Sequence, residues 1–527
     1  MVGFEFDKCT GKAINAIVNH HLNEEMSINN FKILGIIVLI TTFVFSNNLH
    51  YHGTALASSQ NSTTTSSNMS SSIIAANDGL DKSINSTNGG NMSQIINNSL
   101  SQASYTTFNN ASTPAVGIDP TNNNIYVVYF KNETGGANLY IQKSTDMGKT
   151  FSQPVRVNDV KDSIKVEEQW SAPALSIGPG NDIHVVWYKA DHSNPDKYPY
   201  GQVTLQYSKS VDGGMTFTPA VNPAPNDPKG EQSYPFLAVS PDDKVYISYL
   251  NLDYDKPTDM SGTPTVLRVV SSQDGGKTFS NSTIADHSAC QCCSTVVKFG
   301  PQNDIYVTSR STFQNNSIAL TNDTKTDYQI DGGQNQTIIR DITVSHSTDG
   351  PIGQNFTTPV QVGNDRWFMN GCPDAGPGMD FDKNGNMHIA WFTGSEFAPE
   401  GPGFYYTTSN DDGATFNNPI PIHLLSEQWI PPTTQYLKID KYGNSWIVFV
   451  NSEGLKKSDT YSEDYSFEGH GTIHLAIVDK NGIIVKNGNF ASGDITKHYP
   501  FTTGSDDLML ISWMDGDDVK LATIPVL

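Results

Sequence analysis

Short segments of alternating hydrophobic and polar residues recur along the chain from residue 113 onward. Each follows a turn and most end at an aromatic side chain, a period of two that is typical of half-buried β-strands. Seven copies lie at residues 125–129, 181–187, 243–249, 305–309, 386–391, 445–449 and 508–513. Such regular recurrence predicts a repeat architecture in which one small β-unit is used many times.

An eight-residue pattern, Ser-x-Asp-x-Gly-x-Thr-Phe, follows four of these segments, at 144–151, 210–217, 272–279 and 409–416, with a degenerate copy at 347–356. Its Asp can accept hydrogen bonds from the main-chain amides of a hairpin turn, its Gly can take a positive φ, and its Phe can fill space between neighbouring sheets. We therefore expect a structural role for Asp146, Asp212, Asp274, Asp349 and Asp411.

The repeat predicts an all-β fold, a β-propeller of four-stranded blades. Residues 113–527 divide into seven units of roughly 59 residues, enough for four short strands each. The last unit supplies only three strands, so its outer strand would come from the chain before residue 113, within 100–108. Such pairing of the two ends removes an exposed sheet edge. We expect seven blades, with six blades plus an added sheet as the alternative.

The first hundred residues have a different composition. Residues 33–45 form an apolar run that suits a secretory signal, and Ala55-Leu56-Ala57 has the form of a cleavage site. We assign 1–57 to a signal peptide or an uncleaved signal anchor, with 1–25 an over-called start because Met26 leaves a shorter leader. Residues 58–112 are mostly Ser, Thr and Asn, which predicts a disordered linker. Together with many Asn-x-Ser/Thr sequons, the leader predicts an extracellular or cell-surface protein.

The net charge of the chain limits the classes of molecule that it can bind. The chain has 54 acidic and 32 basic residues, a net charge of −22. Phosphate binding needs a basic face, so nucleic acid is excluded as a partner, and a membrane contact is expected only through an N-terminal anchor. An anionic substrate would also be repelled at long range unless arginines cluster around it.

The eight-residue repeats resemble the Asp-box of the bacterial neuraminidase repeat family, within the sialidase superfamily. The resemblance covers residues 113–527 and implies a propeller fold, with glycan processing as the chemistry and no required cofactor. Sialidases of this type are similar in having six blades, an arginine triad for the substrate carboxylate, a Tyr nucleophile paired with Glu, and an Asp acid/base. This chain lacks a Phe/Tyr-Arg-Ile-Pro motif and has only five arginines. If it is an enzyme, the resemblance implies a glycoside hydrolase of the exo-sialidase type.

The predicted topology brings several chemically active side chains towards one face. Arg310, Arg340 and Arg366 belong to the fourth unit and its crossover to the fifth, and could clamp a carboxylate. The crossovers that lead into the innermost strands carry acids, two tyrosines that could act as phenol nucleophiles, and tryptophans that could stack on sugar rings. The acids are Glu168, Glu231, Asp374 and Glu427, the tyrosines are Tyr234 and Tyr499, and the tryptophans are Trp170, Trp367 and Trp429. A repeated packing requirement is the alternative explanation for these residues.

All cysteines except Cys9 lie in two short motifs, Cys290-Gln-Cys292-Cys293 and Gly-Cys372-Pro. Superposing the fourth and fifth units places Cys290 and Cys372 at one structural position, before an innermost strand. An even set of four cysteines in a secreted chain predicts two disulfides. The alternative is a soft-metal site for copper or zinc with His287 or His498, or a redox site.

The sequence therefore predicts a secreted sialidase-like propeller that binds or hydrolyses extracellular glycans or glycoproteins through one face of the ring. Two alternatives remain open: a non-catalytic module that binds a protein at the surface, and a cysteine-centred metal or redox protein.

Overall fold

The computed structural model describes part of the chain: residues 89–164, 172–198, 201–254, 265–314, 338–368, 374–424, 436–451, 456–457, 467–468, 471–495 and 500–527. The chain separates into two compact units, Met1–Ser83 and Ile84–Leu527, and every described residue belongs to the second. No helix within the described ranges is long and apolar enough to cross a membrane. The apolar run at 33–45 lies outside them.

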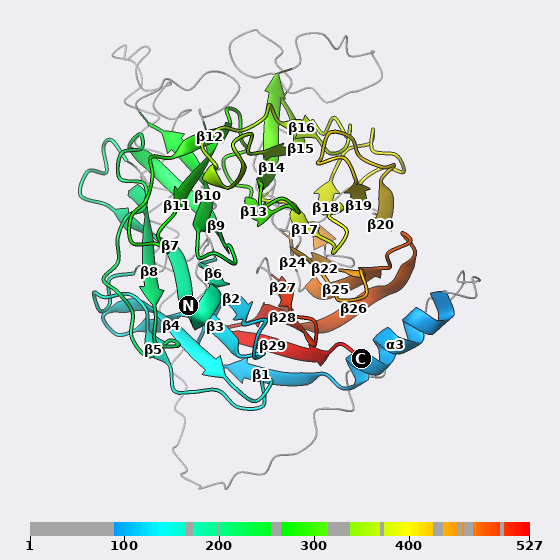
Figure 1. Cartoon of the computed structure of the whole chain (residues 1–527), viewed down its shortest axis with the longest axis horizontal. Coiled ribbons are helices and arrows are strands. Elements are labelled where there is room, and N and C mark those ends of the chain that lie inside the picture. The colour runs from blue at the N-terminus through cyan, green and yellow to red at the C-terminus, as the bar shows by residue number, and fades with distance from the viewer. Residues whose placement is uncertain are drawn as a thin grey trace, which may run out of the picture. The chain divides into compact units, whose positions relative to one another are not determined.

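The second unit is all-β, with six sheets of four or more strands that follow one another around a common centre (Figure 1). The first three sheets in chain order contain β2 (Ser112–Ile118), β3 (Ile125–Glu133), β4 (Gly136–Ser144) and β5 (Val155–Arg156); then β6 (Ala174–Ile177), β7 (Ile183–Asp191), β8 (Gln202–Ser210), β9 (Gly230–Val239), β10 (Val245–Asp253), β11 (Thr265–Ser272) and β12 (Thr283–Asp286); then β13 (Val296–Phe299), β14 (Ile305–Gln314), β15 (Ile338–His346) and β16 (Val360–Gln361).

The next three sheets contain β17 (Gly378–Phe381), β18 (Met387–Thr393), β19 (Gly403–Ser409) and β20 (Ile420–Leu424); then β21 (Tyr436–Ile439), β22 (Ser445–Asn451), β25 (Gly471–Val478) and β26 (Ile484–Ile495); then β27 (Phe501–Gly504), β28 (Leu508–Asp515), β29 (Asp518–Pro525) and β1 (Ser104–Phe108). A separate two-stranded sheet joins β23 (Lys456–Lys457) to β24 (Phe467–Glu468), and short 3-10 helices lie at Pro179–Asn181 and Gly350–Ile352.

Neighbouring strands within each sheet are antiparallel, with one exception in the seven-stranded sheet. There, β8 and β9 share a single parallel residue pair, Val203 with Glu231, so the sheet consists of two antiparallel groups, β6–β8 and β9–β12. All seven alternating segments noted in the sequence lie in strands: β3, β7, β10, β14, β18, β22 and β28. Each is the second strand, in chain order, of its group, where a group is a four-stranded sheet or one of the two antiparallel parts of the seven-stranded sheet.

The eight-residue repeat adopts one turn at four places. At 210–217, the Asp212 carboxylate accepts hydrogen bonds from the Thr216 amide (2.9 Å) and the Ser210 hydroxyl (2.8 Å), while Gly214 has φ of 90°. Asp146, Asp274 and Asp411 accept the same bonds. In the degenerate copy, Asp349 accepts the Gln354 amide instead. These aspartates stabilise turns, and their carboxylates are directed at the main chain.

The folded part begins earlier than the predicted linker boundary at residue 112. Helix α3 (Gly89–Ser101) places Met92, Ile96 and Leu100 on one side, and all three pack against the core shared by β22, β25, β28 and β29. Strand β1 then pairs along its length with β29, from Ser104 with Thr523 to Phe108 with Val519. The high Ser/Thr/Asn content hides the apolar residues, which are spaced one helical turn apart.

The hydrophobic core is divided into clusters, and the larger ones lie between two successive groups of strands. One cluster joins β3 and β4 to β7, the next joins β7 and β8 to β10, and another joins β28 and β29 to β2 and β3. The first strands of successive groups also lie against one another, and β27 contacts β2. Each group is therefore stabilised on both faces by its neighbours.

Three histidines within this core are held in the neutral form. Burial, with a smaller contribution from the charge of Lys209, lowers the pKa of His184 to about 3, and burial lowers the pKa of His474 to about 4. Burial also lowers the pKa of His388. His184 and His388 share one arrangement, in which Nδ1 is paired with the hydroxyl of Tyr207 or Tyr406.

Acid is expected to destabilise the fold through these histidines. An unfolded histidine binds a proton below about pH 6.5, whereas His184 and His474 remain neutral in the folded state, so their stabilisation is complete above pH 6.5 and is lost as the pH falls. Between pH 6.5 and 5, each should lower the free energy of unfolding by about 2 kcal/mol. Urea unfolding across this range measures the slope, which His474→Gln should reduce and the exposed control His287→Gln should not. A slope unaffected by His474→Gln would contradict the assignment.

Candidate functional site

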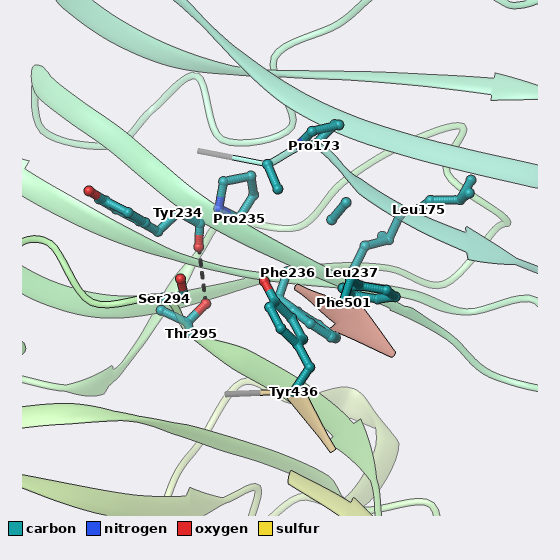
Figure 2. A pocket seen from close by; sticks show the side chains of 12 residues that line it. Pro173, Leu175, Tyr234, Pro235, Phe236, Leu237, Ser294, Thr295, Tyr436 and Phe501 are labelled. Atoms are coloured by element: carbon teal, nitrogen blue, oxygen red, sulfur yellow. Dashed lines mark hydrogen bonds between the residues drawn. The ribbon is translucent and has the colours of Figure 1, made fainter. Parts of the chain in front are cut away.

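The crossovers into the first strands of several groups meet at a small cavity of about 30 Å³ (Figure 2). Its lining comes from the starts of β6, β21 and β27, the residues just before β13 and the second half of β9, and it includes Leu175, Tyr234, Ser294, Tyr436 and Phe501. A space of this size suits about one water and is too small for a sugar ring. A glycan at this place would therefore lie over the mouth rather than inside the cavity.

Tyr234 is held in an unusual main-chain conformation at this mouth. Its φ is 53°, in the left-handed region that an aromatic residue seldom occupies. The hydroxyl of Thr295 donates to the Tyr234 carbonyl oxygen at 3.2 Å, and Pro235 follows directly. The ring is half-buried and turned away from Tyr436 and Phe501 (Figure 2). Strain of this kind often accompanies a functional position.

The other described acids of this face have different surroundings. Asp374 also has a positive φ, 46°, and is half-buried. Burial, with the added charge of Asp374, raises the pKa of the Tyr436 hydroxyl well above its usual value, so Tyr436 stays protonated. Glu231 is only 2% exposed and accepts a hydrogen bond from the Tyr254 hydroxyl at 2.7 Å.

The three arginines of the predicted clamp have three different environments. Arg310 is fully buried and donates to the main-chain oxygens of Ala375 (3.0 Å), Arg340 (2.7 Å) and Phe392 (2.6 Å). Arg340 donates to the sulfur of Cys290. Arg366 lies over the ring of the exposed Phe397, 5.4 Å from its centroid. Of these three arginines, Arg366 is the one whose guanidinium lies against an exposed aromatic ring.

Several predicted residues cannot be placed. Glu168, Trp170, Cys372, Glu427, Trp429, His498 and Tyr499 lie outside the described residues. Trp367 is described: it is 5% exposed, and its ring lies 4.8 Å from the Arg310 guanidinium. It packs in the core against Phe392.

The cysteine motif folds into a compact cluster beside the cavity. Cys290 and Cys293 are buried free thiols, and the Cys293 thiol donates to the Cys290 sulfur across 2.9 Å. The sulfur of Cys292 lies 3.9 Å from that of Cys290. Cys293 directly precedes Ser294 and Thr295, which line the cavity.

Charges around this cluster favour a thiolate on Cys290. Burial alone would raise the pKa of the Cys290 thiol, but the hydrogen bond from Cys293 and the positive charge of Arg340 lower it to about 5. Burial and the neighbouring Cys290 raise the pKa of the Cys293 thiol well above its usual value. The pair therefore holds one negative charge and one proton.

The same sulfurs are also close enough together to contact one metal ion. The three sulfurs lie within 4.8 Å of one another. A structural zinc site needs four nitrogen or sulfur ligands, whereas the described residues supply two free thiols here, and His287 is exposed. Copper(I) accepts soft thiolates and remains the better match of the two metals.

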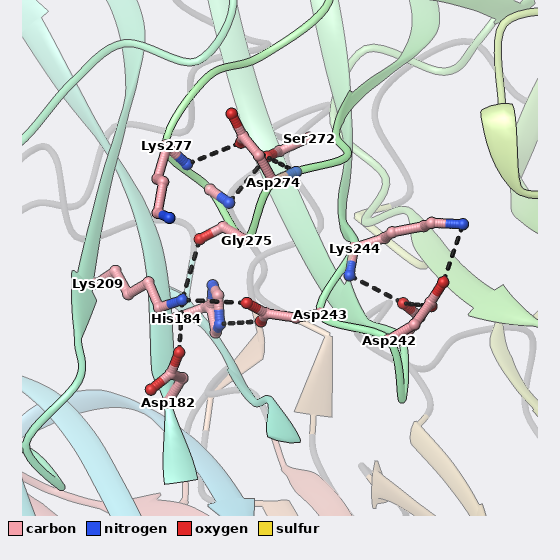
Figure 3. Close-up of polar contacts among 12 residues, drawn as sticks. Asp182, His184, Lys209, Asp242, Asp243, Lys244, Ser272, Asp274, Gly275 and Lys277 are labelled. Carbon is pink, nitrogen blue, oxygen red and sulfur yellow. Dashed lines mark hydrogen bonds and ion pairs between the residues drawn. The ribbon is translucent and has the colours of Figure 1, made fainter. Parts of the chain in front are cut away.

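A second group of potential ligands, Asp182, His184 and Asp243, lies elsewhere between β7, β8 and the β9–β10 turn (Figure 3). The ammonium group of Lys209 occupies the centre of this group, 2.5 Å from Asp182 and 3.4 Å from Asp243. The positive charge that a metal would supply is already provided by Lys209.

Some buried charged residues were not among the predicted site residues. Asp380 on β17 contacts Lys438 on β21 (2.9 Å) and Lys298 on β13 (3.5 Å), linking three first strands. The three residues occupy the same place in short apolar strands, and an alignment of the units could have found them. Asp341, whose carboxylate accepts the Arg366 and Trp367 amides, was also missed.

No protein-family model and no curated protein sequence matches the chain. Among solved structures, the chain is similar to a polysaccharide lyase of family PL25, an ulvan lyase, with 12% identity, a TM-score of 0.45, and 79% of this chain and 94% of the other covered. It is also similar to the GH93 α-L-arabinofuranosidase of Fusarium graminearum (14% identity, TM-score 0.41, 72% and 99% covered). The Trypanosoma rangeli sialidase follows at 10% identity and a TM-score of 0.34, with 79% and 55% covered. Values this low do not assign an activity to this chain.

Proposed function

We propose that residues 104–527 form a seven-bladed β-propeller that acts outside the cell or on its surface. Counting the two groups of the seven-stranded sheet separately gives seven groups, and the pairing of β1 with β29 supplies the fourth strand of the last. The core clusters between successive groups, including the one between β28–β29 and β2–β3, support closure of the ring.

The mouth of this ring is proposed to bind an extracellular glycan. The observation that carries the proposal is Tyr234, a half-buried aromatic held at positive φ within β9, beside the cavity that the first strands of several groups line. An aromatic face can stack on the apolar face of a sugar ring, and Asp374 could accept hydrogen bonds from its hydroxyls. The Asp-box resemblance of the repeats points to the same class of ligand.

Binding is favoured over hydrolysis by the described residues. Glycoside hydrolysis uses two carboxyl groups facing one bond, or in some families a tyrosine nucleophile. Near this mouth, Glu231 is buried against Tyr254 and Tyr436 is kept protonated, and Asp374 is the one described candidate acid that is half-buried rather than buried.

Tyr234→Ala is expected to weaken glycan binding about ten-fold, because losing a stacked aromatic face removes roughly 1–2 kcal/mol. A panel of immobilised glycans identifies the ligand, and calorimetry with the best binder measures the affinity of each variant. Release of reducing sugar from the same panel detects hydrolysis.

Two variants control this experiment. Tyr234→Phe keeps the ring and should retain binding, while Tyr105→Ala removes a tyrosine that is 49% exposed on the outer strand β1 and should have no effect. The proposal is wrong if no glycan in a broad panel binds, or if Tyr105→Ala weakens binding as much as Tyr234→Ala does.

A further inference from the structure

Cys290 and Cys293 form a Cys-x-x-Cys pair at a fixed place in the crossover between β12 and β13. The Cys290 amide donates to the Arg310 carbonyl at 2.7 Å, and the Cys293 amide donates to the Cys290 carbonyl at 3.4 Å. These contacts turn both side chains inward, so that the sulfurs touch at 2.9 Å. Two thiols this close need only a small movement to join as a disulfide.

Hydrogen-bond donors from other strands surround the two sulfurs. The Nη1 group of Arg340, on β15, donates to the Cys290 sulfur at 3.1 Å. The main-chain amide of Ala375 donates to the Cys293 sulfur, and the carbonyl of Ala375 accepts from Arg310 Nε at 3.0 Å. All of these donors favour a negatively charged sulfur, which exists in the dithiol state and is lost in the disulfide.

We propose that Cys290 and Cys293 are a reversible dithiol–disulfide couple, and that Arg340 stabilises its reduced state. A couple whose thiolate is stabilised is a stronger oxidant when it is in the disulfide form. This inference does not depend on glycan binding.

The chemical partner is a low-molecular-weight disulfide, RSSR. The Cys290 thiolate attacks one sulfur of RSSR, which forms a mixed disulfide and releases RS⁻. Cys293 then loses its proton and attacks the Cys290 sulfur, which forms the internal disulfide and releases the second RS⁻. In sum, one dithiol and one RSSR give one protein disulfide and two RSH, with two electrons moving from protein to RSSR.

The burial of the two sulfurs limits the size of the disulfide that can react with them. Both sulfurs have no exposed surface, which excludes direct docking of a folded protein partner against them. The nearest open space is the cavity at Ser294, one residue beyond Cys293. Exchange therefore proceeds with small disulfides and at a rate limited by local opening of the crossover.

The experiment equilibrates the full chain in buffers of reduced and oxidised glutathione, quenches with acid, alkylates free thiols, and locates them by peptide mass spectrometry. Cys290 and Cys293 should change together in one two-electron transition. Arg340→Met should shift the equilibrium towards the disulfide about ten-fold, which equals about 30 mV towards more negative potential. Arg340→Lys, which keeps a positive charge, should show a smaller shift.

Arg156→Met removes an arginine from the remote strand β5 and should leave the transition unchanged. Circular dichroism of each variant confirms that it is folded. Three results would overturn the proposal: a pair that stays reduced in fully oxidised glutathione, a potential that Arg340→Met does not move, or purified protein with one equivalent of copper or zinc on these sulfurs.

Discussion

Asp380→Asn is expected to lower the free energy of unfolding by about 3–5 kcal/mol. The carboxylate is 6% exposed, contacts the ammonium groups of Lys298 and Lys438, and accepts the Ile439 amide at 3.0 Å. Burial alone would raise the pKa of Asp380, but the two lysines hold it well below its usual value. Asparagine has nearly the same shape without the charge, so two partly buried cations would lose an anion that they share. Chemical denaturation at neutral pH measures the loss.

A matched control uses an ion pair at the surface. Lys383 and Asp506 are 3.3 Å apart, and both side chains are 69% exposed, so Asp506→Asn should change stability by less than about 0.5 kcal/mol. In the double variant Asp380→Asn with Lys298→Met, part of the loss should be recovered, because one unpaired cation is removed. Equal effects of Asp380→Asn and Asp506→Asn would show that the buried cluster does not stabilise the fold.

Arg310→Met should destabilise the protein by a similar amount, about 3–5 kcal/mol. Its guanidinium donates to three main-chain carbonyls that belong to three separate segments, and each would be left without this donor. Its positive charge also acts on two buried carboxylates, Asp341 and Asp365, which would lose a compensating cation. Thermal and urea unfolding report the change directly.

Arg366→Met is the matched comparison for Arg310→Met. Arg366 lies over an exposed ring, so its loss should cost under about 1 kcal/mol of stability. Arg310→Lys keeps the charge but cannot reach three divergent carbonyls, and an intermediate loss is expected. If Arg310→Met proved as stable as the parent, the buried position of Arg310 would be wrong.

The fold was largely predictable because its signals are local and repeated. Seven alternating segments are strands, and the Asp-Gly turns recur with the same hydrogen bonds at Asp146, Asp212, Asp274 and Asp411. The boundary at residue 112 was wrong because α3 has its apolar residues four apart within a polar composition, and composition averages such a pattern away.

The candidate site was less predictable, because its properties come from contacts between distant strands. The sequence suggested that Arg310 binds a substrate carboxylate. In the structure, its guanidinium instead donates to the main-chain oxygens of Ala375 and Phe392, and this depends on how β14 packs against the next sheet. The four cysteines predicted two disulfides, with a metal or redox site as the alternative, whereas Cys290 and Cys293 are free thiols. The contact of Arg340 with Cys290 joins residues 50 positions apart and has no sequence pattern of its own.

The pairing of β1 with β29 also sets the order in which the chain can fold during synthesis. Thr107 and Lys520, which face each other across this pair, are separated by 413 residues. At roughly 5–20 residues per second, a ribosome needs on the order of 20–80 s between making one and making the other. For that interval β1 has no partner strand, and the last group of strands cannot be completed until the carboxyl terminus has left the ribosome.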